Sequence, residues 1–142
     1  MNLLPEDREK LYKLLTLDEG VRQFPYFDTR GYITIGRGYN LSARGLPLHI
    51  IDELTDLVVN EIELRLDEVL PLYSSLDSAR QIVLIDIAYN AGVGGLMDFH
   101  RMLAALEKKD YLTASLEIQN SHLVESRRNR LAKIMLTGSI KL

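Results

Sequence analysis

The sequence predicts an α+β fold, with a small β-hairpin lobe near the N-terminus and a larger lobe that is all helical. Aromatic and β-branched residues surround a turn between Phe24 and Gly38, whereas most of the remaining chain repeats apolar residues at helical spacing. The chain has 142 residues, of which 46% are apolar, so it can bury one compact core but is too short for two ordinary domains. We therefore expect a single domain.

Capping and turn residues predict the first two elements. A helix is predicted from Pro5 to about Asp18, because proline suits the first turn of a helix and Gly20 suits its C-terminal cap. A β-hairpin is predicted around Asp28-Thr29-Arg30-Gly31, which has aspartate and glycine at the two ends of the turn, where each is favoured. A glycine-rich loop then leads to Pro47.

Helical patterns fill the rest of the chain. The run Ile82–Ala88 is apolar nearly all round, so we expect its helix at the centre of the helical lobe. Gly92 begins a glycine-rich break in that helix, and Gly138 is placed to cap the last one. The predicted helices cover residues 50–70, 75–91, 96–108, 111–119 and 125–136.

Composition excludes several classes of function. The 17 Lys and Arg against 20 Asp and Glu give a net charge of -3, which excludes a uniformly basic nucleic-acid coat. Without cysteine there is no disulfide, thiolate metal site or cysteine nucleophile, and His49, His100 and His122 are too scattered for a metal-ligand pattern. We expect no metal, no cofactor and no nucleic-acid partner.

Membrane insertion is not expected either. The stretches without charge fall far short of the ~18 residues that span a bilayer, and the segment Met1–Lys10 is too acidic for a secretory signal. Nothing in the sequence demands more than one copy, so we expect a monomer.

Charge is divided unevenly along the chain. Residues 1–100 carry a net charge of -7 and residues 101–142 carry +4, so an anionic ligand would favour the second part. Four cations fall on one short helical segment: Arg127, Arg128, Arg130 and Lys133. They form either an ordinary basic surface or a contact with a substrate or a catalytic carboxylate.

Two carboxylates lie next to breaks in secondary structure. Glu19 falls at a helix C-terminus, where the dipole disfavours negative charge, which suits a general acid. Asp28 opens a tight turn that can keep it ionised, and Thr34 lies on the returning strand with a hydroxyl free to hold a water. Two carboxyls with separate roles are what glycoside hydrolysis requires. Taken alone, both residues also fit purely local roles at a helix end and in a turn.

The full pattern from Glu19 to Gly38 resembles a known catalytic signature. It has Glu-Gly followed by Tyr-x-Asp-x-x-Gly-Tyr-x-Thr-Ile-Gly-x-Gly, with nine residues from Glu19 to Asp28 and six from Asp28 to Thr34. This pattern is similar to that of the phage-type lysozymes. The segment Pro71–Gly92 resembles the central helix of that family, and residues 129–130 resemble an Asn-Arg pair in its C-terminal helix, so the resemblance covers most of the chain.

The resemblance implies a lysozyme-like fold with a cleft between the lobes and hydrolysis of the β-1,4 bond between N-acetylmuramic acid and N-acetylglucosamine in bacterial peptidoglycan. It implies Glu19 as the general acid, Asp28 as the base or charge stabiliser, and Thr34 as the residue that places the attacking water. The two carboxyl groups would be roughly 6.5–9.5 Å apart, which leaves room for a water.

Further site residues and the lobe boundaries also come from the resemblance. Arg130 would pair with Glu19, while Asn40, Tyr89 and Asn90 would contact the sugar chain. Residues 18–45 would form the hairpin lobe, and residues 1–17 together with 46–142 the helical lobe.

The chain departs from the family at a few positions. Tyr39 stands where histidine is common, Leu123 stands where an aromatic residue is common, and tryptophan is absent. Two alternatives are a lytic transglycosylase, which forms an anhydro product, and a non-catalytic wall-binding module. We expect synthesis in the bacterial host cytoplasm without a signal peptide, and action in the periplasm after holin-type release or delivery by a secretion or tail apparatus.

Overall fold

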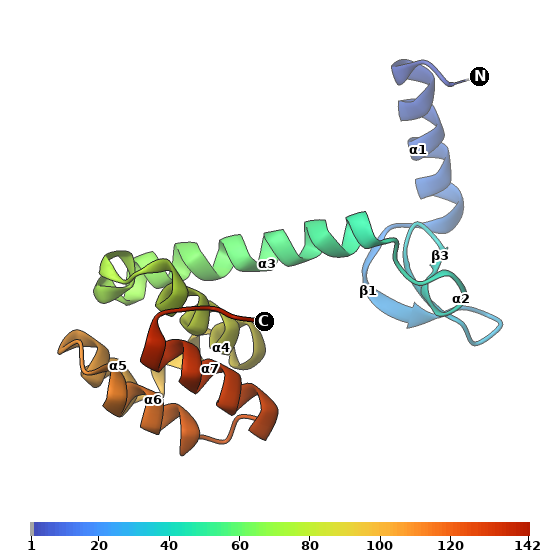
Figure 1. Cartoon of the computed structure of the whole chain (residues 1–142). Coiled ribbons are helices and arrows are strands. Elements are labelled where there is room, and N and C mark those ends of the chain that lie inside the picture. Colours follow the sequence, from blue (N-terminus) through green and yellow to red (C-terminus); the bar gives the residue numbers. More distant parts are fainter. Residues whose placement is uncertain (1) are drawn as a thin grey trace. The chain divides into compact units, whose positions relative to one another are not determined.

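The computed structural model describes residues 2–142, which are mostly helical and include one small antiparallel sheet (Figure 1). The predicted α+β class is confirmed. The chain divides into two compact units, the hairpin unit (Met1–Asp52) and the helical unit (Glu53–Leu142). The elements are, in order, α1 (Pro5–Glu19), β1 (Arg22–Phe27), β2 (Ile33–Gly36), β3 (Tyr39–Asn40), α2 (Leu41–Arg44), α3 (Leu48–Val69), the 3-10 helix η1 (Pro71–Ser75), α4 (Ser78–Met97), α5 (His100–Glu107), α6 (Tyr111–Gln119) and α7 (Glu125–Thr137).

The first helix begins and ends where its sequence predicts. Pro5 lies at the start of α1, and Glu6 and Asp7 occupy its first turn, where the helix dipole favours negative charge. The helix ends at Glu19 because Gly20 adopts φ 75° and donates its amide N–H to the carbonyl of Thr16 at 2.8 Å.

The predicted hairpin is confirmed and gains a third strand. β1 pairs antiparallel with β2, with Tyr26 opposite Thr34, and β2 pairs antiparallel with β3, with Thr34 opposite Asn40. The sequence predicted only a loop after Gly38, where the structure has β3 and α2. These elements of two and four residues are too short to show periodicity.

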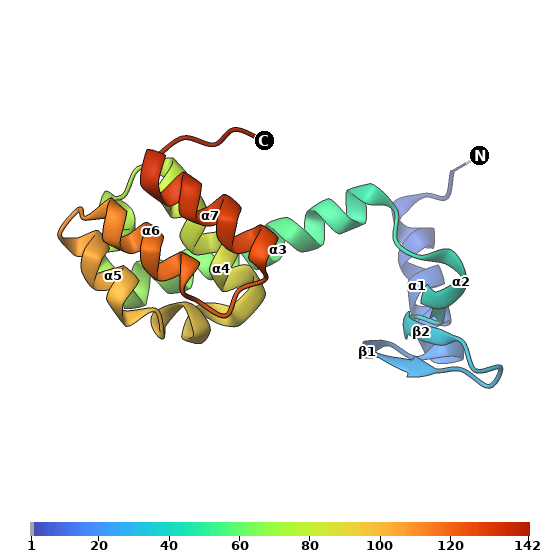
Figure 2. The ribbon, with the colours of Figure 1, turned by 60° about the horizontal axis from the view of Figure 1, so that its bottom comes forward.

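The helical unit holds the hydrophobic core. The residues at its centre come from α4, where Val83, Leu84 and Ile87 are fully buried. Ile82 on the same helix is 46% exposed, so the apolar run is covered on most of its surface but not all round. α6 packs against α5 and α7, and α7 packs against α4 (Figure 2).

The boundaries around the predicted glycine-rich break differ in one respect. Gly92 is non-helical, at φ 78° and ψ 163°, as the glycine run predicts. The chain then resumes helix up to Met97, so the next helix begins at His100 and not at Leu96. Tertiary packing outweighs the low helix propensity of the two remaining glycines here, since Leu96 is fully buried.

A buried arginine ties the ends of two helices together. The guanidinium of Arg80 on α4 donates to the carbonyls of Met135 at 2.8 Å and Leu136 at 3.2 Å, at the end of α7. It also pairs with Asp77 at 3.1 Å and lies 3.4 Å from the ring centroid of Tyr111. Carbonyls in the last turn of a helix lack hydrogen-bond donors within the helix. The Arg80 guanidinium provides donors for two of these carbonyls.

Within residues 2–142, no single helix is long and apolar enough to cross a membrane. α4 and α5, bent by 90°, pass that test only as a pair.

Candidate catalytic site

Glu19 closes α1 and lies against the turn between β2 and β3. A Cβ atom built on Gly38 would stand 2.6 Å from the Glu19 Oε2, so the backbone of this turn contacts the carboxyl group directly. The residue is otherwise exposed, which leaves the opposite side of the carboxyl open. The position is set by the end of the helix and by the glycine that faces it.

Asp28 is held in the hairpin turn by two backbone amides. The amide of Arg30 donates to Asp28 Oδ1 at 2.9 Å, and the amide of Tyr32 donates to the same oxygen at 2.8 Å. The carbonyl of Asp28 accepts from the amide of Gly31 at 3.0 Å, which closes the predicted turn. Within residues 2–142, Oδ1 takes all the hydrogen bonds to this carboxylate, so Oδ2 is the oxygen that can meet a water.

Thr34 is buried beside this turn, with 3% of its surface exposed. Its hydroxyl donates to the carbonyl of Tyr32 at 3.0 Å, so the expectation of a free hydroxyl is wrong for its proton. The oxygen can still accept a hydrogen bond from a water. Thr34 can therefore hold a water by accepting one of its O–H groups, but not by donating to its oxygen.

Tyr32 connects the two predicted residues Asp28 and Thr34. Its amide donates to the Asp28 carboxylate, and its carbonyl accepts both the Asp28 amide, at 2.9 Å, and the Thr34 hydroxyl. This backbone role could not be predicted from the sequence, because a main-chain contact does not depend on the residue type.

Asn40 has a local structural contact of its own. It lies opposite Thr34 in β3 and caps α2, where its Oδ1 accepts from the amide of Ala43 at 3.0 Å. The Nδ2 group keeps its two donors for another partner. Glu19, Asp28, Thr34 and Asn40 therefore all belong to the hairpin unit.

Tyr89, Asn90 and Arg130 belong to the helical unit. Tyr89 and Asn90 are exposed in the last turn of α4 before Gly92, and Tyr89 has 46% of its surface exposed. Asn90 lines a hollow of about 640 Å³ with residues of α5, α6 and the loop that follows α6.

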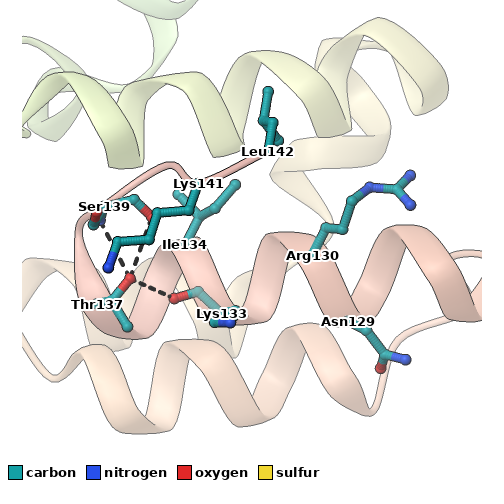
Figure 3. Close-up of a pocket in the computed structure, with 8 residues that line it drawn as sticks. All are labelled: Asn129, Arg130, Lys133, Ile134, Thr137, Ser139, Lys141 and Leu142. Carbon is teal, nitrogen blue, oxygen red and sulfur yellow. Dashed lines mark hydrogen bonds between the residues drawn. The ribbon is translucent and has the colours of Figure 1, made fainter.

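Arg130 projects from α7 at a smaller hollow of about 380 Å³ (Figure 3). Lys133 and Lys141 line the same hollow, and Thr137 bonds to the carbonyls of Lys133, at 2.9 Å, and Ser139, at 3.3 Å. Within the described helical unit Arg130 forms no ion pair. Its guanidinium is thus available to a partner.

The other two arginines of the basic segment have structural contacts. Arg127 forms an ion pair with Asp86, with 3.0 Å between Nε and Oδ1. This contact is not a hydrogen bond, and the buried Oδ1 of Asp86 has no hydrogen-bond donor among the described residues. Arg128 donates to the carbonyl of Leu123 at 3.0 Å. Arg127 and Arg128 are therefore used in structural contacts, whereas Arg130 and Lys133 line the smaller hollow.

Comparison with known proteins gives relatives but no family model that matches the chain. It is 23% identical to probable T4-type lysozyme 1 of Dictyostelium discoideum over 89% of this chain and 94% of that protein. It is 24% identical to probable T4-type lysozyme 2 of the same organism, over 92% and 96%. The chain is thus similar to T4-type lysozymes over most of its length. It is also 28% identical to the pre-baseplate central spike protein Gp5 of Enterobacteria phage T4, over 91% of this chain but only 28% of that protein.

The departures from the phage-type lysozyme pattern have visible local partners. The Tyr39 hydroxyl donates to the carbonyl of Gly45 at 2.5 Å, and the Arg44 guanidinium lies 4.9 Å from the centroid of its ring. Leu123 is buried, with 8% of its surface exposed. Within residues 2–142, no group of three or more His, Cys, Asp or Glu side chains is placed to hold a metal ion.

Proposed function

We propose that this protein is a lysozyme that hydrolyses the β-1,4 bond between N-acetylmuramic acid and N-acetylglucosamine in peptidoglycan and so lyses bacterial cells. The observation that carries the proposal is the network of Asp28, Tyr32 and Thr34, in which the backbone of Tyr32 links the Asp28 carboxylate to the Thr34 hydroxyl. Glu19 contacts the turn that follows the same strand. The relationship to T4-type lysozymes supports the same activity.

In the proposed reaction, Glu19 gives its proton to the glycosidic oxygen as the bond to the sugar carbon breaks. A water donates one hydrogen bond to the Thr34 oxygen and gives its other proton to Asp28 Oδ2 while its oxygen attacks that carbon. This role for Thr34 uses only the acceptor that the structure leaves on its hydroxyl. We expect carboxyl groups roughly 6.5–9.5 Å apart, because a water must fit between Asp28 and the sugar.

The remaining predicted residues stay in the proposal as binding groups. Arg130 would pair with Glu19 through its planar guanidinium, which is suited to orienting a carboxylate. Asn40, Tyr89 and Asn90 would contact the sugar chain, and Asn40 would do so with its Nδ2 donors, because its Oδ1 caps α2. The substrate cleft itself would form between the two lobes.

Water attack is preferred over transglycosylation because a transglycosylase can dispense with the base, whereas Asp28 and Thr34 are both kept and linked. A non-catalytic wall-binding module would not need all three residues of the signature. We further propose that the protein acts on periplasmic peptidoglycan after holin-type release or delivery by a secretion or tail apparatus. The relative named as a phage baseplate spike offers a precedent for the tail route.

Replacing Glu19 tests the proposal directly. The protein should clear a suspension of chloroform-treated Gram-negative cells, and Glu19→Gln should lose about 100-fold to 10,000-fold in rate, because an amide cannot give up a proton. Glu9→Gln is the matched control, since Glu9 is exposed on the same helix and pairs only with Lys13 among the described ion pairs.

Mass spectrometry of the released fragments decides between the alternatives. Reducing N-acetylmuramic acid ends are expected from water attack. Anhydro ends would establish the transglycosylase instead. Absence of clearing by the unmodified protein, with no fragments released, would favour the wall-binding module.

A further inference from the structure

The turn between β2 and β3 is fastened to the last turns of α1 by an arginine. Arg37 Nε donates to the Thr16 hydroxyl at 2.9 Å, and that hydroxyl donates to the carbonyl of Tyr12 at 2.8 Å. The Arg37 guanidinium also lies 5.6 Å from the centroid of the Tyr12 ring, within the range of a cation–π contact. A link across 21 residues of sequence therefore joins the turn to the helix that ends at Glu19.

The residue after Arg37 touches the Glu19 carboxyl group. A Cβ atom on Gly38 would stand 2.6 Å from Oε2 and 3.0 Å from Cδ of Glu19. Those distances are too short for a real contact, so an alanine would push the carboxyl aside. The carboxyl is the flexible end of its side chain, so it can move without unfolding the helix.

Gly36, two residues earlier at the end of β2, differs from Gly38 in what an added side chain would meet. Both glycines have positive φ, 66° and 69°, so a side chain at either position meets the same backbone strain. A Cβ atom on Gly36 would have no atom within 4 Å. The chain thus contains a natural control in the same turn.

We propose that Arg37 and Gly38 are positioning residues for Glu19: Arg37 holds the turn against α1, and the bare backbone of Gly38 fixes where the Glu19 carboxyl lies. This inference rests on the proposed function, in which Glu19 gives a proton to the substrate. A small displacement of a reacting group is costly because proton transfer needs hydrogen-bond distance. Neither residue gives or takes a proton in the proposed reaction, and both act through Glu19.

The central experiment compares Gly38→Ala with Gly36→Ala. The two variants should lose similar stability to heat, since both carry the same strain. At saturating peptidoglycan, Gly38→Ala should clear cells about 100-fold more slowly than Gly36→Ala, while the concentration for half-maximal rate stays the same. Equal rates in the two variants would overturn the proposal.

Arg37 is tested by Arg37→Met, Thr16→Val and the double variant. Each single variant should lower the maximal rate about tenfold, and the double variant should be no slower than Arg37→Met, because the two side chains form one link. Arg8→Met, at an exposed position near the start of α1, is the matched control and should keep the full rate. Independent, multiplying losses from Arg37→Met and Thr16→Val would show that they do not act as one unit.

A measurement without substrate separates this inference from the proposed function. In nuclear magnetic resonance spectra, Glu19 γ protons should show nuclear Overhauser effects to the α protons of residue 38 in the unmodified protein and in Gly36→Ala, but not in Gly38→Ala. Absence of these effects from the unmodified protein would overturn the positioning role. If they are present while the protein releases no wall fragments, only the proposed function fails.

Discussion

The hairpin unit and the helical unit are held in shape by different interactions. The helical unit buries 21 apolar side chains, from Ile62 to Met135. Among residues 2–52 of the hairpin unit, Thr34 alone is buried. Polar links define that unit instead, among them the Asp28 turn, the Asn40 cap and the Arg37 bond to Thr16. Directional bonds fix the orientation of a reactive side chain more closely than apolar contacts, which are non-directional.

Core truncation should produce the largest loss of stability. Leu84 is fully buried on α4, so Leu84→Ala should lower the free energy of unfolding by about 2–5 kcal/mol through lost burial and the cavity left behind. Phe24→Ala in the hairpin unit removes a larger side chain that is 79% exposed, and the change should stay within about 0.5 kcal/mol. Urea unfolding followed by circular dichroism measures both. Similar losses of unfolding free energy in the two variants would contradict the contrast between a packed helical unit and a hairpin unit held by polar bonds.

Substitutions at Asp28 should separate geometry from charge in the hairpin unit. Asp28→Asn keeps an oxygen for the amides of Arg30 and Tyr32, so its unfolding free energy should change by less than that of Asp28→Ala, which loses about 1 kcal/mol. Both variants should lose about 100-fold or more in lytic rate, because neither can accept a proton. Thermal unfolding and cell clearing give the two quantities. Full activity of Asp28→Asn would remove Asp28 from the proposed reaction.

A titration in the helical unit should change stability only at high pH. Burial and, second, the neighbouring Glu63 carboxylate raise the pKa of Tyr73 to about 12. Between pH 10 and pH 12 the unfolded chain loses this proton while the folded chain keeps it, so stability should fall by up to about 1.4 kcal/mol per pH unit. Below pH 10 this stabilisation is fully present. In Tyr73→Phe the free energy of unfolding, measured by urea unfolding at each pH, should fall less steeply above pH 10. The same pH dependence in both proteins would contradict the assignment.

The elements that sequence analysis predicted well are those specified by local residues. The bounds of α1 follow from Pro5 and Gly20, and the hairpin turn follows from Asp28 and Gly31. The late start of α5 at His100 could not be predicted, because it depends on burial of Leu96 by residues distant in the sequence. Local capping and turn chemistry is visible in sequence, whereas tertiary packing is not.

The candidate site shows the same division. The signature pattern predicted Glu19, Asp28 and Thr34, and the turn geometry of Asp28 is confirmed. It did not predict that Thr34 donates to Tyr32, because the acceptor is a main-chain carbonyl. The role of Gly38 was also missed, since a glycine in a turn carries no sign of what its backbone faces.

The hydrogen bonds of Arg80 imply that the two units complete their folding at different times during synthesis. The link from Arg37 to Thr16 spans 21 residues, so it can form soon after the hairpin leaves the ribosome. The bonds from Arg80 to Met135 and Leu136 span 55 and 56 residues, so the helical unit cannot close until residue 136 has emerged. At roughly 5–20 residues per second, residue 136 follows residue 45 by about 5–20 seconds. During that interval α7 is not yet present to cover the apolar side chains of α4. The nascent chain is therefore most prone to aggregation in this interval.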